Sequence, residues 1–415
     1  MAVVMVGVFG LLIPRMGEPF SGHHEFNGVF YGQIARNYLR YGLFETKGAQ
    51  VTNLWRADKT SWSLHTHHPA TYPLLLAGVF SVVGESEAAA RVVSVIFSML
   101  GVGVLMLLSC EVFGRGKTLA VLPVSVTPLF LYYGRLPVFE PLLLTFTSLA
   151  LWAYVKIDYD GKYRWWLMGS IFVLLLIDWP GFWVGAWILA AEALTKKRKE
   201  VVLGIVAAMV GAGVIILGHQ WLVTGHLLRD FLSVVSVRLG VAAQPYTPSG
   251  WLWLLVSRSK AFFGLPVLIA AALGLGLTVV KGSGKESKML LVALSTGVSH
   301  ILVFRNIAWY HDYMLYHLIP FAVLAVAGLA NRFDKRGEGS VVAGLSLLAI
   351  ITVVVTNKFY VDLAAIRPHE KCVEFGERVK ESDKVLTFEV WEEEARICPP
   401  FIGYYGDKPF EIKTK

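Results

Sequence analysis

Long apolar runs recur along almost the whole chain and constrain its fold more than any other feature. Hydrophobic residues make up 55% of the 415 residues and charged residues only 16%, whereas soluble proteins carry about 25% charged residues. The mean hydropathy is +0.57. A helix needs about 20 apolar residues to cross a bilayer, so we predict an all-α polytopic membrane protein. About eleven transmembrane helices are expected, at residues 2–14, 89–110, 118–134, 139–157, 165–177, 181–195, 201–223, 258–280, 289–304, 313–331 and 340–356.

The basic residues set the expected orientation of these spans. They cluster in short loops between the apolar runs, most clearly at Lys196–Lys199, and such loops face the cytoplasm. The net charge of +8 therefore indicates membrane topology and no nucleic-acid partner. Counting spans outward from Lys196–Lys199 puts residues 15–88 in one long external loop that contains juxtamembrane helices, with 72–83 as a re-entrant piece. Residues 224–257 form a second external loop.

The last part of the chain changes character after residue 356. We expect residues 1–356 to form the transmembrane domain and residues 357–415 a small extracytoplasmic α/β cap. Its predicted strands are 382–390 and 404–412, and its predicted helices are 375–381 and 392–397. Cys372 and Cys398 both lie in this region, where a disulfide and two free thiols are both compatible with the sequence.

One stretch of the first external loop, residues 21–40, joins a His/Glu cluster to an amphipathic helix. Its aromatic residues suit the headgroup level of a membrane, where its arginines, Arg36 and Arg40, would reach toward phosphate. Glu25 is the first choice for a general base, because a carboxylate can take a proton from an acceptor hydroxyl within hydrogen-bond reach. Alternatively, and equally well, Glu25 only caps the helix that begins near Asn27.

Further polar residues fall at the outer ends of spans that are far apart in sequence. Ionisable groups at membrane depth are costly and usually face a cavity, although snorkelling interfacial side chains would give the same pattern. Glu140 precedes Pro141 at the start of a span, so it is either a second catalytic acid or a helix N-terminal charge. The candidate substrate-binding residues are His24, His67, His68, Arg135, Asp178, Arg305, His311 and Asp312.

The histidines raise the question of a metal. Two histidines of the His65–His68 group and a carboxylate such as Glu25 could hold a divalent ion, but their spacing matches no strong metal signature. Hydrogen bonds to phosphate or sugar are the preferred role. We therefore expect no required cofactor, with a divalent metal as the open alternative. The chain has no Gly-rich phosphate loop, which argues against a machine driven by cytosolic nucleotide.

Several of these motifs together resemble the C-type membrane glycosyltransferases. The matching pieces are Tyr31-x-x-Ile34-Ala35-Arg36 after an acidic residue, His68-Pro69, Gly84-Glu85-Ser86-Glu87-x-x-x-Arg91, and Arg135 with Glu140. The most similar groups are the polyprenyl-phosphate-sugar-dependent protein mannosyltransferases, archaeal relatives included, and the lipid A aminoarabinose transferases. The resemblance covers residues 1–200 well, whereas the later spans match only in their arrangement along the chain.

The resemblance implies an inverting transferase of the plasma membrane whose active site faces outward. Its donor would be a polyprenyl-phosphate sugar, and its acceptor a protein, a glycan or a lipid. Glu25 matches the family's loop base, Glu140 its second acid and Arg305 its lipid-phosphate ligand. The family more often has Asp where this chain has Asn27, which leaves the base open between Glu25 and Glu140. A lipid-linked sugar flippase or secondary transporter is the rival class, but it would carry polar residues at mid-span and broken helices in matching halves.

Overall fold

The computed structural model describes residues 1–195, 198–241, 245–333 and 337–415. Of the basic loops used to orient the chain, Lys196, Lys197 and residues 334–336 lie outside the described part. The chain divides into two compact units. Unit 1 comprises residues 1–14, 95–134 and 139–360, and unit 2 comprises residues 15–94, 135–138 and 361–415. Residues 361–415 thus belong to the same unit as residues 15–94, and the expected cap at 357–415 stays a prediction.

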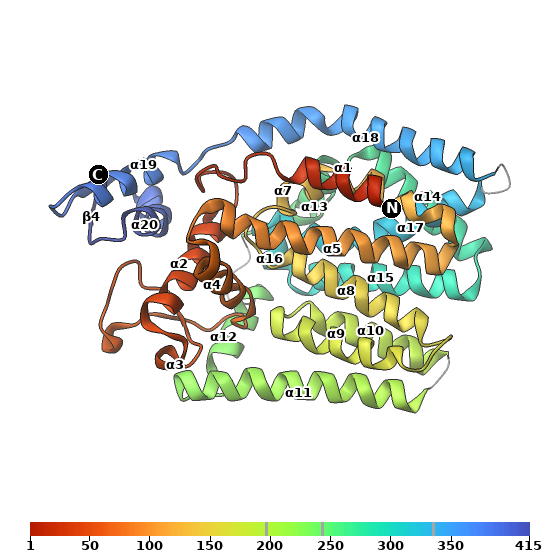
Figure 1. Cartoon of the computed structure of the whole chain (residues 1–415), viewed down its shortest axis with the longest axis horizontal. Coiled ribbons are helices and arrows are strands. Elements are labelled where there is room, and N and C mark those ends of the chain that lie inside the picture. The colour runs from red at the N-terminus through yellow and green to blue at the C-terminus, as the bar shows by residue number, and fades with distance from the viewer. Residues whose placement is uncertain (196–197, 242–244, 334–336) are drawn as a thin grey trace. The chain divides into compact units, whose positions relative to one another are not determined.

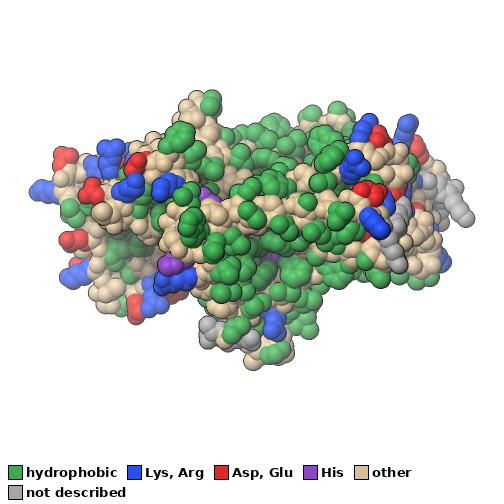
Figure 2. Space-filling view, turned by 90° about the horizontal axis from the view of Figure 1, so that it is seen from below, with side chains coloured by type: hydrophobic (Ala, Val, Ile, Leu, Met, Phe, Trp, Pro, Cys, Tyr) green, Lys and Arg blue, Asp and Glu red, His purple; other side chains and the backbone are tan. Residues whose placement is uncertain are grey.

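Unit 1 is a helical bundle (Figure 1). Helix α8 packs on α9, α9 on α11, α10 on α15, and α14 on α17. Figure 2 shows hydrophobic side chains gathered over the middle of one face, with charged side chains toward both ends, as expected of a surface that meets lipid. The described elements of this unit are α1 (Ala2–Leu12), most of α5 (Glu87–Phe113), η2 (Arg115–Ala120), α6 (Val121–Ser125), α7 (Pro128–Tyr133), α8 (Glu140–Lys156), α9 (Tyr163–Ile177), α10 (Gly181–Leu194), α11 (Lys199–Thr224), α12 (Arg229–Arg238), α13 (Pro248–Phe263), α14 (Leu265–Lys281), α15 (Gly284–Val303), α16 (Arg305–Tyr310), η3 (Asp312–Leu318), α17 (Ile319–Arg332) and most of α18 (Glu338–Ala365).

Five helical stretches within the described residues are long and apolar enough to cross a membrane, or six if one bent pair counts as a single span. The five are Glu87–Phe113, Lys199–Thr224, Gly284–Val303, Asp312–Arg332 and Glu338–Glu381. Helices α1, α4, α9 and α10 are apolar but shorter. A mostly helical protein with several helices able to cross a membrane is therefore confirmed, whereas the count of about eleven spans stays a prediction.

Two expected spans are interrupted. The span predicted at 258–280 is bent by 105° between α13 and α14, and α13 begins at Pro248, inside the stretch predicted as a loop. The bend lies at Gly264, whose φ of +76° is left-handed, and an added Cβ would lie 2.6 Å from Thr356, so glycine is required there. The span predicted at 118–134 is divided into η2, α6 and α7. Pro128 has no N–H to continue α6, and Thr127 instead caps α7 by accepting from the Phe130 amide.

Unit 2 contains short helices and two small sheets. Strands β1 and β2 pair antiparallel, with Gln50 opposite His65, and β3 and β4 pair parallel, with Thr387 opposite Glu411. Helix α2 packs against α4 and α20, and α19 against α20. The described elements are α2 (Phe26–Tyr41), α3 (Leu43–Thr46), β1 (Gln50–Val51), η1 (Lys59–Ser61), β2 (Leu64–His65), α4 (Thr71–Val83), the first turns of α5, the last residues of α18, α19 (Glu370–Glu381), β3 (Thr387–Val390), α20 (Glu392–Gly406) and β4 (Glu411–Thr414).

The C-terminal part answers one question that the sequence left open and corrects one prediction. Cys372 and Cys398 form a disulfide that joins α19 to α20, with their Cα atoms 5.2 Å apart. The strand predicted at 404–412 is wrong in its first half, because α20 continues through Pro399 and Pro400 to Gly406. Tertiary packing overrides the helix-breaking tendency of the prolines here: buried side chains such as Phe401 and Ile402 lie on this part of α20.

Candidate active site

In unit 2, Glu25 is held by three donors at the start of α2. Its Oε2 accepts from the amides of Ser21 (2.9 Å) and Gly22 (2.6 Å), and its Oε1 accepts from Arg91 Nη2 at 2.7 Å. The Arg91 side chain is 3% exposed, and it also donates to the carbonyl of Met16 at 2.8 Å. Charge-assisted bonds of this kind are strong, so Glu25 fixes the loop that leads into α2.

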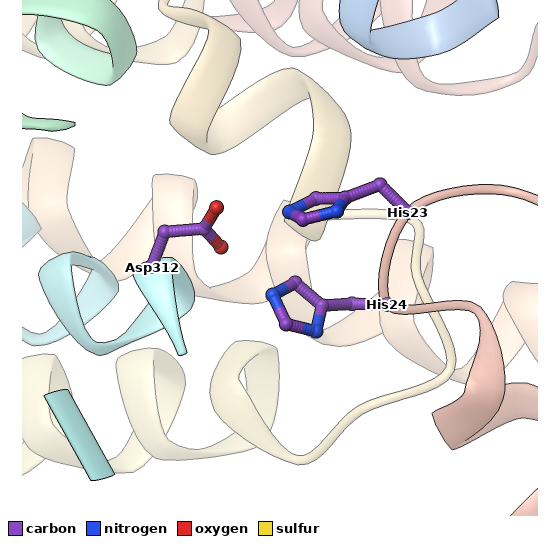
Figure 3. A group of neighbouring side chains, drawn as sticks. All are labelled: His23, His24 and Asp312. Atoms are coloured by element: carbon purple, nitrogen blue, oxygen red, sulfur yellow. The ribbon is translucent and has the colours of Figure 1, made fainter. Parts of the chain in front are cut away.

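The two histidines before Glu25 lie side by side. The ring centroids of His23 and His24 are 4.1 Å apart, and Figure 3 shows both side chains projecting from the same loop. His24 has a left-handed φ of +56°. A third imidazole, His369, belongs to the same unit, and its amide donates to the carbonyl of Ser21 at 3.2 Å. Burial, with the nearby positive charge of His23 and His24, lowers the pKa of His369 to about 4.

The arginines of α2 are not directed at membrane phosphate, which corrects the expectation from the sequence. Arg36 donates to Glu85 (2.9 Å) and to the carbonyl of Tyr404 (2.8 Å). Arg40 donates through Nη2 to both carboxylate oxygens of Asp407, each at 2.6 Å. Amphipathicity alone could not reveal these partners, because Asp407 is more than 360 residues away in sequence. These arginines attach α2 to α20.

The remaining predicted residues of unit 2 are His67, His68 and Arg135. The His65 ring lies 4.9 Å from that of His67 and 5.5 Å from that of His68, between ring centroids. The carbonyl of His68 accepts from Gln50 Nε2 at 2.6 Å, so β1 positions the turn before α4. The unit therefore brings the three imidazoles of the His65–His68 group together. Arg135 is buried, at 6% exposure.

In unit 1, Glu140 begins α8 with Pro141 in its first turn, as the sequence predicted. The residue is 1% exposed. Among the residues that the structure describes, no other residue donates a hydrogen bond to either carboxylate oxygen. An ionised carboxylate is rarely left so deep without partners, so its oxygens are placed to receive a proton or a hydrogen bond from a ligand. Asp178, which is also buried, is near enough to interact with it electrostatically.

The structure adds residues that the sequence did not single out. The Tyr133 hydroxyl donates to Asp312, the carboxylate labelled in Figure 3. Tyr313, whose ring centroid lies 5.7 Å from that of Tyr133, interacts electrostatically with Glu140, Asp312, Arg238 and Asp178. His311 stacks on Tyr313, with centroids 4.8 Å apart. Unit 1 therefore gathers its predicted polar residues, Arg305 excepted, around two tyrosines.

An apolar cavity of about 360 Å³ lies in the same unit. It is formed by the turn between α9 and α10, by α12, and by the end of α15. One cation, Arg238, is among its described lining residues, which are Trp179, Phe182, Trp183, Phe231, Val234, Val235, Arg238, Leu239, Val303 and Phe304. Arg305 follows Phe304 directly and is exposed. The position of Arg238 in the second predicted loop, residues 224–257, which contains several aromatic residues, was the available signal for it.

The fold resembles that of the C-type glycosyltransferases, and one stretch of the chain also matches such enzymes in sequence. A sequence profile of the family described as dolichyl-phosphate-mannose-protein mannosyltransferase matches residues 67–210. No curated protein matches the chain significantly in sequence.

Solved structures of two enzymes are similar to this chain. ArnT from Cupriavidus metallidurans, bound to undecaprenyl phosphate, is 14% identical with a TM-score of 0.62, over 98% of this chain and 74% of that one. The oligosaccharyltransferase AglB from Archaeoglobus fulgidus, in complex with an inhibitory peptide and a dolichol-phosphate, is 13% identical with a TM-score of 0.67, over 99% and 64%. The same archaeal enzyme in complex with Zn and sulfate is 11% identical with a TM-score of 0.65, over 99% and 61%. The chain thus spans less than two thirds of the oligosaccharyltransferase chains.

Proposed function

We propose that the protein transfers a sugar from a polyprenyl-phosphate donor to a hydroxyl of a protein, glycan or lipid acceptor on the extracytoplasmic side of the plasma membrane. The observation that carries this proposal is the pair of buried carboxylates, Glu140 and Asp178, in the same unit as the apolar cavity that Arg238 lines. The likeness to ArnT and AglB, whose structures hold polyprenyl phosphates, supports this choice of donor class.

The cavity in unit 1 suits the lipid part of such a donor. Its walls are aromatic and aliphatic, which favours an isoprenoid chain, and Arg238 supplies one positive charge for the phosphate. Guanidinium groups bind phosphate in a bidentate manner. We assign a second phosphate contact to Arg305, because it is exposed and adjoins Phe304 at the wall of the cavity.

The proposed reaction is a single displacement with inversion at the anomeric carbon. The acceptor oxygen attacks that carbon while its proton passes to a carboxylate base. The bond from the anomeric carbon to the phosphate oxygen breaks, and the polyprenyl phosphate leaves with the bonding electrons. Arg238 and Arg305 stabilise the charge on the departing phosphate, which needs no strong acid.

The contacts of the two candidate bases favour Glu140 for this step. Glu25 already accepts three hydrogen bonds, whereas the Glu140 oxygens accept none from other described residues. A base needs a free lone pair directed at the acceptor hydroxyl. We therefore propose Glu140 as the base and Glu25 as the residue that holds the acceptor-side loop. His24, His67, His68, Arg135, Asp178, His311 and Asp312 keep their proposed substrate contacts.

A divalent metal fits best at His23 and His24. Their adjacent, half-buried imidazoles are suitable nitrogen ligands, and the archaeal oligosaccharyltransferase was solved with Zn. When bound, such a metal would supply positive charge to the substrate phosphate. Loss of transfer in a chelator, restored by one divalent ion, would support a metal. Full activity in the chelator would exclude a requirement.

The test of the proposed function is a transfer assay. The purified protein in lipid nanodiscs receives polyprenyl-phosphate sugars labelled in the sugar, together with candidate acceptors, and product is scored for transfer and anomeric configuration. Transfer with inversion is expected. Movement of intact donor across the bilayer without transfer would instead indicate a flippase, a class that the comparisons do not support.

A further inference from the structure

A second apolar cavity, separate from the proposed donor cavity, lies between α14, α17 and α18 of unit 1. Its volume is about 520 Å³, within the range of ligand pockets, about 300–1,000 Å³. Ser340 is the one residue with a polar side chain among its described lining residues. The aliphatic and aromatic walls include Ile269, Leu273, Leu329, Phe333, Leu345 and Leu348.

The helices around this cavity limit what can fill it. Asp312–Arg332 and Glu338–Glu381 are both long and apolar enough to cross a membrane, and α14 belongs to the bent pair that passes the same test. One serine side chain offers water fewer than the two to four polar partners that a buried water needs. A hydrocarbon chain from the surrounding bilayer is therefore the fitting occupant.

Cationic groups near one end of the cavity select among lipids. Arg332 lies in the last turn of α17, next to the lining residue Phe333. Its Nη2 lies 3.4 Å from Glu286, and its buried Nε has no hydrogen-bond partner within the described chain. Lys281 ends α14 and is exposed. A guanidinium with an unused buried donor favours an anionic headgroup.

We propose that this cavity binds one chain of an anionic phospholipid, whose headgroup contacts Arg332. The site is distinct from the donor cavity, which is lined by α12 and the turn between α9 and α10. It therefore stands whether or not the proposed transfer reaction is confirmed. Its function would be to join α18 to the bundle, because only 28% of this span is buried.

Two glycines provide a matched pair of variants. In the described chain, a Cβ added at Gly344, which lines the cavity, or at Gly213, on α11, meets no atom within 4 Å. Gly344→Phe should fill the cavity, whereas Gly213→Phe adds the same ring elsewhere. The probe is phosphatidylglycerol with a photoactivatable group in its chain, in nanodiscs of phosphatidylcholine, with the labelled peptides mapped by mass spectrometry.

Labelling of the peptides that contain Leu329 and Leu345 is expected in the parent and in Gly213→Phe, and at least about tenfold less in Gly344→Phe. Arg332→Gln should reduce the preference for phosphatidylglycerol over phosphatidylcholine about fivefold, the usual effect of one basic residue at a membrane surface. Lys162→Gln, which removes an exposed cation paired with Asp160, should leave it unchanged. Equal labelling of both phenylalanine variants, equal labelling by phosphatidylcholine, or displacement by polyprenyl phosphate would each overturn the proposal.

Discussion

Replacing Glu140 by Gln tests the proposed chemistry most directly. The amide keeps the size of the side chain but cannot take up the acceptor proton. General base catalysis contributes roughly 10²–10⁴-fold, so the transfer rate should fall by that factor, or about 2.7–5.5 kcal/mol of transition-state stabilisation. Donor affinity should change little, because the base acts on the acceptor.

The structure also predicts what this change does to stability. Glu140 is 1% exposed and accepts no hydrogen bond from another described residue, so its replacement breaks no ion pair. The loss is limited to the interaction of a carboxylate with the start of α8, about 0.3–1 kcal/mol. The melting temperature in detergent should therefore stay close to that of the parent while transfer falls.

Glu25→Gln is the matched comparison, since it makes the same chemical change in a different setting. It removes the charge that pairs with the buried Arg91 at 2.7 Å, and breaking a buried pair typically costs about 3–5 kcal/mol. The retained amide oxygen reduces that cost. We expect reduced stability and a smaller effect on the rate of the folded fraction. Normal transfer by Glu140→Gln, with transfer abolished in a folded Glu25→Gln, would refute our reasoning and assign the base to Glu25.

Four further outcomes are expected. Arg305→Ala should weaken donor binding strongly, and Arg305→Lys should restore it only in part, because lysine cannot make the bidentate contact. If both variants keep the parent's KM for the donor, Arg305 is only an interfacial anchor. The pKa of His369, about 4, lies below its unfolded value of about 6.5, so its stabilising contribution is present above pH 6.5 and lost as the pH falls toward 4. Between pH 7 and 5 the free energy of unfolding should drop by at most about 2 kcal/mol, and His369→Gln should flatten that pH dependence of the melting temperature. Replacing Cys372 and Cys398 by Ser should lower the free energy of unfolding by about 3–4 kcal/mol, the value for a loop of 26 residues. The melting temperature should fall accordingly, and an unchanged melting temperature would show that α19 and α20 need no crosslink. Asp58→Cys should react with an impermeant maleimide on intact cells, and protection would reverse the expected orientation.

The sequence by itself determined the class of the protein and the identity of most candidate site residues. Apolar runs separated by basic loops predict a polytopic helical protein because bilayer insertion depends on local hydrophobicity. The start of α8 at Glu140 and Pro141 was predictable for the same local reason, since proline favours the first turn of a helix. The order of short motifs was enough to identify the resemblance to C-type glycosyltransferases.

Only the tertiary structure decided the partners of those residues. Glu25 and Glu140 are both acidic residues near a predicted helix start, yet one meets Arg91 and the other no described donor. The pairing of Arg40 with Asp407 and the continuation of α20 through its prolines depend on packing between segments far apart in sequence. Residue type and spacing set what a side chain can do, but its hydrogen bonds and burial come from non-local contacts, which a single sequence does not specify.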